Sequence, residues 1–208
     1  MSRIATRAEI REEILDATDH LLARYGYRKM TMDDLAQEVG IGKGTIYLHF
    51  ASKEEVVLSH IDRIVERLKE RLWAVARSEA AVAIRLRLML FARVMYRFDS
   101  VQHYTQSLDD LLAALRPAFL ARRARYFDDE ALIFVEVLEE GRKSGVFAFK
   151  DSLDAAHALL LATNSLLPYS LSTGELGERE EIEAKTAAIA DLLLTGLLRR
   201  DGAQTKKR

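Results

Sequence analysis

The sequence predicts an all-α protein, and three observations indicate that fold class. Only two of the 208 residues are proline, and no Asn-Gly or Gly-Gly pair marks a tight hairpin. Ala, Leu, Glu and Arg, which all favour helices, dominate the composition. Apolar residues also recur at helical spacing along most of the chain. We therefore expect three short helices followed by five or six longer ones.

The first two helices are placed by their apolar periodicity and their caps. Apolar residues recur at helical spacing from Ile10 to Tyr25, and Gly26 is expected to end this helix as a C-terminal cap. Thr31 begins the second helix, because its hydroxyl can accept a free backbone N–H of the first turn. Gly40 is expected to end it.

A third, short helix is expected from about Gly42 to Phe50, and a long fourth helix follows it. Ser52 and Glu55 form a capping-box pattern at the start of that fourth helix, which runs to about Ser78. The later helices are expected at about residues 80–98, 101–115, 118–143, 153–171 and 179–199.

Two prolines shape the expected breaks between these later helices. Pro117 is expected to separate two helices, because proline lacks the backbone donor that a helix interior needs. Pro168 removes the helical partner of the Asn164 carbonyl, so we expect a kink there that exposes polar groups. The polar residues 201–208 are expected to be a disordered tail.

The glycine-rich stretch "VGIGKGTIYLHF", residues 39–50, could in principle cradle a phosphate. A P-loop would need Gly where Gln37 stands and Ser or Thr where Gly44 stands. The dinucleotide pattern fails as well, since its third glycine would fall on Thr45. Because a helical pattern precedes the glycines, we interpret them as a turn between two helices.

Two helices joined by a tight turn form a helix-turn-helix. Ala36 is small where the two helices must approach, and Gly40 permits a left-handed backbone in the turn. Ile46 and Phe50 are expected in the core. The residues left on the exposed front of the third helix are Lys43, Gly44, Thr45 and Tyr47.

Residues 7–57 resemble the DNA-binding domain of TetR/AcrR-type transcriptional regulators, through "ATDHLLARYGY", "TMDDLA", "GKGTIYLHF" and "SKEE" in that order. The family often has Ser where Gly42 stands, although Gly remains an acceptable N-cap. The rest of the chain matches in its helical architecture alone. The resemblance implies that the third helix enters the major groove of double-stranded operator DNA, with two subunits reading two half-sites.

Carried over by position, the implied DNA contacts centre on the third helix. Thr31 and Lys53, each at a helix N-terminus, are expected to meet phosphates. Arg28 and Lys29 would add salt-dependent affinity, and His49 would contact the DNA backbone or pack beneath the third helix. The full set is Arg28, Lys29, Thr31, Gly42, Lys43, Gly44, Thr45, Tyr47, His49 and Lys53.

The net charge of −1 gives no sign of nucleic-acid binding in itself, so DNA contacts depend on local placement. Acidic and basic residues balance within the first 53 residues. We expect the basic residues from 28 to 53 near the DNA, and most acidic residues on the first helix and the back of the second.

The expected domains are a helix-turn-helix DNA-binding domain at 1–52 and a helical effector-binding and dimerisation domain at 53–200. The resemblance implies an effector bound in the larger domain, with the fourth helix as connector. Polar and aromatic residues among apolar ones could line its pocket or simply pack. The candidates are Phe91, Met95, Tyr96, His103, Tyr104, Phe134, His157 and Asn164.

The last two helices are rich in Ala and Leu, and the final one is apolar around more than one face, which indicates a homodimer interface. We expect a dimeric DNA-binding regulator, a repressor released by a small hydrophobic or amphipathic ligand. The alternatives are a ligand-independent regulator or an activator.

An enzyme is the competing class of function, and the sequence does not favour it. No histidine has Glu three residues before it, as a di-iron bundle would need, and H-E-x-x-H and G-x-S-x-G are absent. Without cysteine there is no disulfide or thiolate metal site, and no cofactor or metal is expected. The most apolar stretch is interrupted by His157, Asn164 and Pro168, so we expect a cytoplasmic protein without a membrane span.

Overall fold

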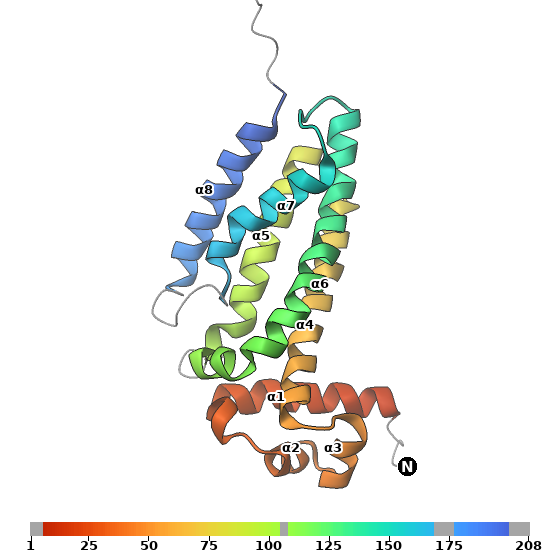
Figure 1. Cartoon of the computed structure of the whole chain (residues 1–208), viewed down its shortest axis with the longest axis vertical. Helices are drawn as coiled ribbons and strands as arrows, with labels where there is room; N and C mark the ends of the chain where they lie inside the picture. The colour runs from red at the N-terminus through yellow and green to blue at the C-terminus, as the bar shows by residue number, and fades with distance from the viewer. Residues whose placement is uncertain (1–5, 105–107, 169–176, 200–208) are drawn as a thin grey trace, which may run out of the picture. The chain divides into compact units, whose positions relative to one another are not determined.

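The computed structural model of the chain describes residues 6–104, 108–168 and 177–199. These residues are almost entirely helical, and the expected all-α fold class is confirmed (Figure 1). An isolated bridge pairs Phe147 with Leu198. The elements are α1 (Arg7–Lys29), α2 (Met32–Val39), α3 (Lys43–His49), α4 (Lys53–Ala76), α5 (Val82–Val101), the 3₁₀ turn η1 (Gln102–Tyr104), α6 (Leu108–Lys143), α7 (Ser152–Thr163), the 3₁₀ turn η2 (Asn164–Leu166) and α8 (Arg179–Leu197).

The chain divides into two compact units. The first unit combines 1–66 with 100–123, and the second combines 67–99 with 124–208. Helix α4 therefore contributes to both units, as does α6. The expected division at residue 52 differs from this division by packing, and it stays a prediction.

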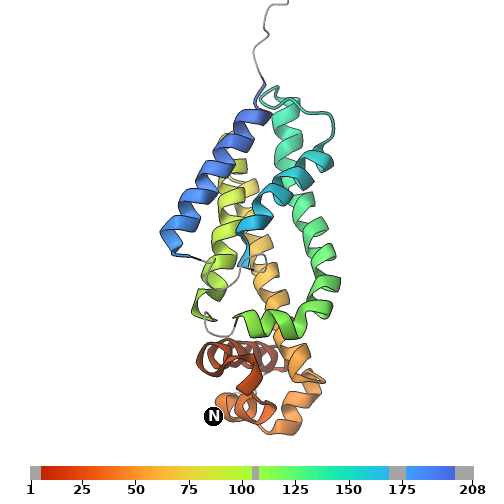
Figure 2. The ribbon, with the colours of Figure 1, turned by 60° about the vertical axis from the view of Figure 1, so that its left-hand side comes forward.

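The first unit is built around α1, with α2 and α3 on the same side of it in both views (Figures 1 and 2). Thr6 and Glu9 form a capping box at the start of α1, with the Glu9 N–H donating to Thr6 Oγ1 over 3.2 Å. Apolar side chains from the three helices then fill a shared core. Its members include Ile14, Leu15, Leu22, Leu35, Ile46 and Phe50, all at most 1% exposed.

The helical backbone of α1 breaks at Gly26, as expected, and one further turn follows it. Gly26 has φ 72° and ψ 167°, so the helix is kinked there and then completes a further turn to Lys29. The Met30 N–H donates to the Gly26 carbonyl over 3.1 Å and closes that turn. Because glycine has no Cβ, the positive φ costs little, and the chain can change direction at this residue.

Two expectations about proline were wrong. Helix α6 runs through Pro117 as one helix, and both Pro117 and Ala113 are exposed, so water can satisfy the carbonyl that loses its donor. Before Pro168, the chain does not continue as a kinked α-helix. Helix α7 ends at Thr163 and a 3₁₀ turn follows, in which the Leu167 N–H donates to the Asn164 carbonyl over 3.1 Å.

The second unit has a continuous apolar core shared by the helices α4 to α8. Helices α7 and α8 lie next to each other in both views (Figure 2). Leu86, Met89, Phe134, Leu138 and Leu160 have no exposed surface in this core. Among the described residues, no helix combines the length and apolar character that crossing a membrane requires. The expected tail at 201–208 and the end of the helix expected to 171 lie outside the described residues.

Candidate nucleic-acid interface

The helix-turn-helix is held together by caps at both ends of α2. Thr31 Oγ1 accepts the Asp34 N–H over 3.1 Å, and the Asp34 carboxylate accepts the Thr31 N–H over 2.8 Å. At the other end, Gly40 adopts φ 76°, and both Gly40 and Ile41 donate their N–H to the Ala36 carbonyl over 3.0 Å. These caps fix the direction in which α3 leaves the turn.

Helix α3 presents one buried and one exposed face. Ile46 is fully buried, whereas Tyr47 is 49% and Leu48 is 73% exposed. Lys43 and Gly44 are also exposed, and Thr45 is half-buried. Gly42 is the N-cap, without a side-chain bond, and its carbonyl accepts the Thr45 N–H over 2.8 Å. A helix face with a cation and a phenol beside a glycine has the donors and the open backbone that DNA contact needs.

Lys43 is already engaged in an ion pair. Its Nζ lies 2.7 Å from Asp33 Oδ2, and this hydrogen bond raises the pKa of Lys43 above its usual value. Asp33 is thus an acidic group beside a proposed DNA contact. The charges of α2 and α3 are consequently less segregated than expected.

The Lys53 side chain hydrogen-bonds to the backbone at the end of α1. Its Nζ donates to the Tyr27 carbonyl over 2.9 Å and to the Met30 carbonyl over 3.1 Å, and it lies 4.5 Å from the centre of the Tyr27 ring. The ammonium therefore compensates carbonyls that lack helical donors. A phosphate contact by Lys53 stays a prediction, and it would compete with these bonds.

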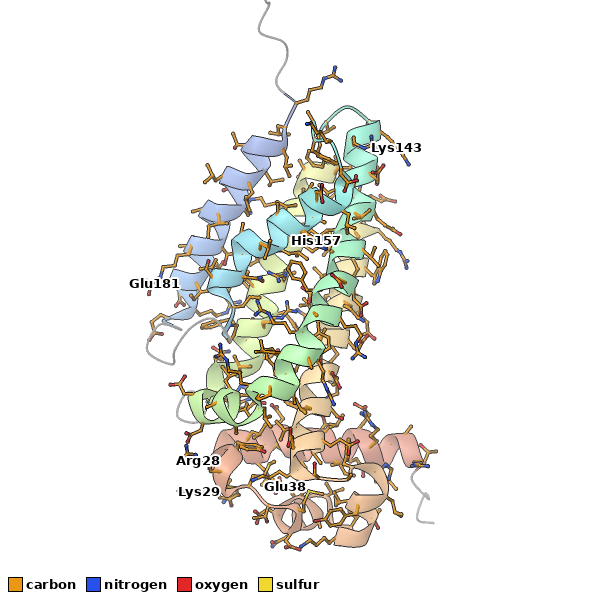
Figure 3. The ribbon with its side chains drawn as sticks, in the orientation of Figure 1. Arg28, Lys29, Glu38, Lys143, His157 and Glu181 are labelled. Carbon is orange, nitrogen blue, oxygen red and sulfur yellow. The ribbon has the colours of Figure 1, made fainter. Side chains whose placement is uncertain are left out.

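The two cations at the end of α1 differ in their surroundings (Figure 3). Arg28 Nη2 lies 2.7 Å from Asp110 Oδ1 at the start of α6, within the same unit. Lys29 is exposed. Lys29 is therefore the more available of the two for a phosphate.

His49, the last residue of α3, is half-buried, with its ring centre 6.4 Å from that of Phe50. Burial lowers its pKa, and the nearby cations Arg7 and Arg11 lower it further. At neutral pH the imidazole is neutral, so it would meet DNA as a hydrogen-bond donor and not as a cation.

Two features of this surface escaped the sequence analysis. Arg7 Nη2 donates to the Leu48 carbonyl over 3.2 Å and so ties the end of α3 to the start of α1. Leu48 itself is the most exposed large apolar residue of the first unit. Its position four residues after Gly44 was the available signal, because residues four apart share a helix face.

The candidate effector residues do not form one group. His103 and Tyr104 belong to the first unit, whereas the other six belong to the second. Tyr104 is 2% exposed, its hydroxyl donates to Asp19, and it lies 3.0 Å from Nε2 of the buried His60. His103 Nε2 lies 3.2 Å from the same Asp19 carboxylate. These contacts give His103 and Tyr104 a place in a polar network between α1, α4 and η1.

In the second unit, the candidate residues have varied surroundings. Met95 and Phe134 are core residues, and Phe91 is half-buried. The Arg71 guanidinium lies over the ring of Tyr96, 4.9 Å from the ring centre. His157 of α7 stacks on Phe127, with ring centres 5.2 Å apart. A ligand role for any of these residues stays a prediction.

A buried charged network in the second unit was not foreseen. Arg93 and Glu130 are each 1% exposed, and Arg93 Nε donates to Glu130 Oε2 over 2.8 Å. Arg93 also donates to Thr163 Oγ1 over 2.7 Å and to Asn164 Oδ1 over 2.8 Å, while Arg97 donates to Glu130. Burial by itself raises the pKa of Glu130, but the two guanidinium groups outweigh it and lower the pKa below its usual value.

Comparison with known proteins places the first three helices in a family. Residues 14–59, which span most of α1, all of α2 and α3 and the start of α4, match the family described as "Bacterial regulatory proteins, tetR family". This stretch is a TetR-type DNA-binding region, and the chain is a DNA-binding regulator of transcription.

Curated relatives match this chain well beyond residues 14–59. The nucleoid occlusion factor SlmA of Haemophilus influenzae is 26% identical over 191 residues, which cover 90% of this chain and 87% of the relative. The HTH-type transcriptional repressor KstR2 of Mycobacterium tuberculosis is 28% identical over 152 residues, covering 71% and 74%.

Solved structures share the fold of both units. A transcriptional regulator from Cytophaga hutchinsonii has a TM-score of 0.75 at 21% identity, covering 90% of this chain and 98% of the other. The regulator FadR of Bacillus subtilis, solved in complex with stearoyl-CoA, has a TM-score of 0.65 at 19% identity, covering 89% and 98%.

Proposed function

We propose that this protein is a homodimeric repressor that binds double-stranded operator DNA through α2 and α3 and leaves it when a small hydrophobic or amphipathic ligand binds. The observation that carries the DNA-binding part is the exposed face of α3, where Lys43 and Tyr47 lie one helical turn apart while Ile46 is buried. The name of KstR2 supports the sign of regulation, since that relative is a repressor.

In this proposal, residues 1–52 are the DNA-binding domain and 53–200 the effector-binding and dimerisation domain. The contact set is the one expected from the sequence, with Thr31 at a phosphate and Lys43, Thr45 and Tyr47 on α3 in the major groove. Such a regulator would act on DNA in the cytoplasm.

Exposed leucines on the last two helices support the homodimer. Leu161 on α7 is 61% exposed and Leu192 on α8 is 73% exposed, although each helix also buries a face in its own unit. A helix with apolar residues beyond its buried face needs a second apolar partner. A second copy of the same two helices supplies one and closes a symmetric dimer.

Ligand release is supported by the FadR relative, whose solved complex contains stearoyl-CoA. For release to work, the ligand must bind the DNA-incompetent arrangement of the dimer more tightly than the competent one. A hundredfold loss of operator affinity needs a difference of about 2.8 kcal/mol between the two arrangements.

Fluorescence anisotropy on operator DNA tests the DNA-binding part. The operator is first isolated by random-sequence selection with the full chain. Wild-type protein is expected to bind it tightly, with affinity that falls steeply as salt rises, because phosphate contacts dominate the binding. Tyr47→Ala should lose specific binding without unfolding, because the ring is half exposed.

Analytical ultracentrifugation tests the dimer. Replacing Leu161 and Leu192 together by Gln should shift the chain from dimer to monomer while its helical circular dichroism is retained. A dimer that persists in the double variant would place the interface elsewhere. A monomeric wild-type chain would contradict the homodimer altogether.

A second candidate is a DNA-binding regulator that needs no small ligand. The match to SlmA along most of this chain favours it, because that relative is named for nucleoid occlusion and not for a metabolite response. The buried Arg93–Glu130 network also favours it, because it fills part of the interior of the second unit. Screening fatty acyl-CoA thioesters for release of the protein from its operator separates the two candidates. An activator would bind the same operator but raise transcription from it in a reporter assay.

A further inference from the structure

Leu48 occupies an unusual place for an apolar residue. It is 73% exposed and lies directly after Tyr47, on a seven-residue helix whose core contact is made by Ile46. It also lies four residues after Gly44, where an added Cβ would meet nothing within 4 Å. Gly44 and Leu48 therefore form an open strip that runs beside the strip of Lys43 and Tyr47.

The backbone beneath Leu48 is held in place. Arg7 Nη2 donates to the Leu48 carbonyl over 3.2 Å, and the following residues return to the core through Phe50, which is 1% exposed. The Phe50 N–H donates to the Ile46 carbonyl over 3.0 Å and closes the helix. The side chain of Leu48 thus projects from a fixed point and not from a loose end.

Single exposed leucines are common on protein surfaces, so exposure alone says little. Leu48 differs because it shares its surface with the proposed DNA contacts Lys43 and Tyr47. Leucine cannot hydrogen-bond to phosphate oxygens or to the polar edges of bases. The apolar group that the major groove of DNA offers is the C5-methyl group of thymine.

We propose that Leu48 determines sequence specificity by packing against a thymine methyl group in each operator half-site. This inference rests on the proposed binding of α3 in the major groove. The apolar contact of Leu48 would make the protein prefer a T·A pair at one position of each half-site. This preference would add to the polar contacts of Lys43 and Tyr47. Two-fold symmetry of the dimer would repeat that preference in both half-sites.

The test uses thymine-to-uracil replacement, which removes the methyl group and leaves the base-pairing edge unchanged. Each thymine of the selected operator is replaced by uracil, one position at a time and in both half-sites. Anisotropy then gives Kd for wild type, for Leu48→Ala and for the control Leu132→Ala, which truncates a 59% exposed leucine on α6. Circular dichroism verifies that all three are folded.

For the wild-type protein and for Leu132→Ala, we expect one thymine per half-site whose replacement weakens binding roughly fourfold, the effect of one apolar carbon leaving a buried contact. For Leu48→Ala, the thymine and uracil operators should bind equally well. The inference is overturned if no thymine is sensitive, or if Leu48→Ala retains the full sensitivity to uracil. A wild-type protein that selects no sequence at all would instead contradict the proposed DNA binding.

Discussion

At the scale of single residues, the proposed DNA contact Lys43 is already paired with Asp33. The ammonium expected to meet the DNA is held 2.7 Å from a carboxylate on α2. We expect Asp33→Asn to tighten operator binding roughly two- to fivefold, because the variant frees Lys43 from a surface ion pair of ordinary strength. Anisotropy at constant ionic strength measures the change.

The matched control for this variant is Glu38→Gln. Glu38 lies on the same helix and is exposed (Figure 3), and its Oε1 lies 3.7 Å from Nδ1 of His20. The Glu38→Gln variant removes one negative charge, as Asp33→Asn does, but at a position that does not contact Lys43. Equal tightening in both variants would mean that net charge, and not the release of Lys43, governs affinity.

Gly44 gives a second prediction at this scale. An added Cβ meets no protein atom within 4 Å, and alanine favours helix over glycine by up to about 1 kcal/mol. Gly44→Ala should therefore raise the stability of the free protein and weaken operator binding roughly tenfold, comparable to losing one base contact. Urea unfolding and anisotropy on the same sample measure both effects. Unchanged affinity would show that DNA does not approach this backbone closely.

Among the elements, α6 packs closely against Phe147 at Gly141, near the end of the helix. A Cβ added at Gly141 would lie 2.1 Å from a ring carbon of Phe147, which is 2% exposed. We expect Gly141→Ala to destabilise the protein by about 1–3 kcal/mol, as in other overpacked cores. Urea unfolding monitored by circular dichroism gives the value.

Gly196 on α8 provides the comparison for that variant. It is exposed, and its added Cβ would meet nothing within 4 Å. Gly196→Ala should be neutral or stabilising by up to about 1 kcal/mol. If the two variants unfold at the same urea concentration, the ring of Phe147 does not pack on Gly141.

The helix-turn-helix was predictable because each of its boundaries has a local chemical cause. Thr31 caps α2 through its own hydroxyl, and Gly40 ends it through a left-handed backbone, so short-range rules suffice. Pro117 was misjudged because its outcome depends on its surroundings. Both Pro117 and Ala113 are exposed, so water can satisfy the carbonyl that Pro117 leaves without a donor.

The exposed face of α3 was also predictable, since helical spacing alone separates Lys43 and Tyr47 from Ile46. The partners of the proposed contact residues were not. The pairing of Lys43 with Asp33, and of Lys53 with the carbonyls of Tyr27 and Met30, depends on how α1, α2 and α4 pack together. Periodicity assigns a face to a residue, but it does not say which charged neighbour will reach it.

For the molecule as a whole, the buried Arg93–Glu130 network is expected to set the response to acid. The pKa of Glu130 is lower in the folded chain than the usual value of about 4.3 that we expect after unfolding. Its contribution to stability is therefore present above about pH 4.3 and is lost as the pH falls through the lower folded-state value. The unfolding midpoint in urea should drop in this acidic range.

Glu130→Gln tests that expectation, since it leaves two guanidinium groups without their carboxylate. We expect a loss of about 3–5 kcal/mol at neutral pH, which shrinks as the pH falls and Glu130 of the wild type becomes protonated. Glu136→Gln, an identical change at an exposed position of α6, is the control and should alter stability little at any pH. A pH-independent difference between Glu130→Gln and wild type would contradict the assignment.

The Lys43–Asp33 pair has a further consequence for how the regulator responds to its ionic surroundings. A free protein cation that meets a phosphate liberates a condensed counterion, and that gain is what rising salt erodes. The charge of Lys43 is already compensated by Asp33 in the free protein. If Lys43 binds a phosphate instead, the Asp33 carboxylate loses its partner and attracts a cation from solution. Net ion release per half-site is then smaller than the number of phosphate contacts, and the Asp33→Asn variant should steepen the salt slope by about 0.9 per freed lysine. The operator affinity of such a regulator would therefore change less when the salt concentration in the cell changes.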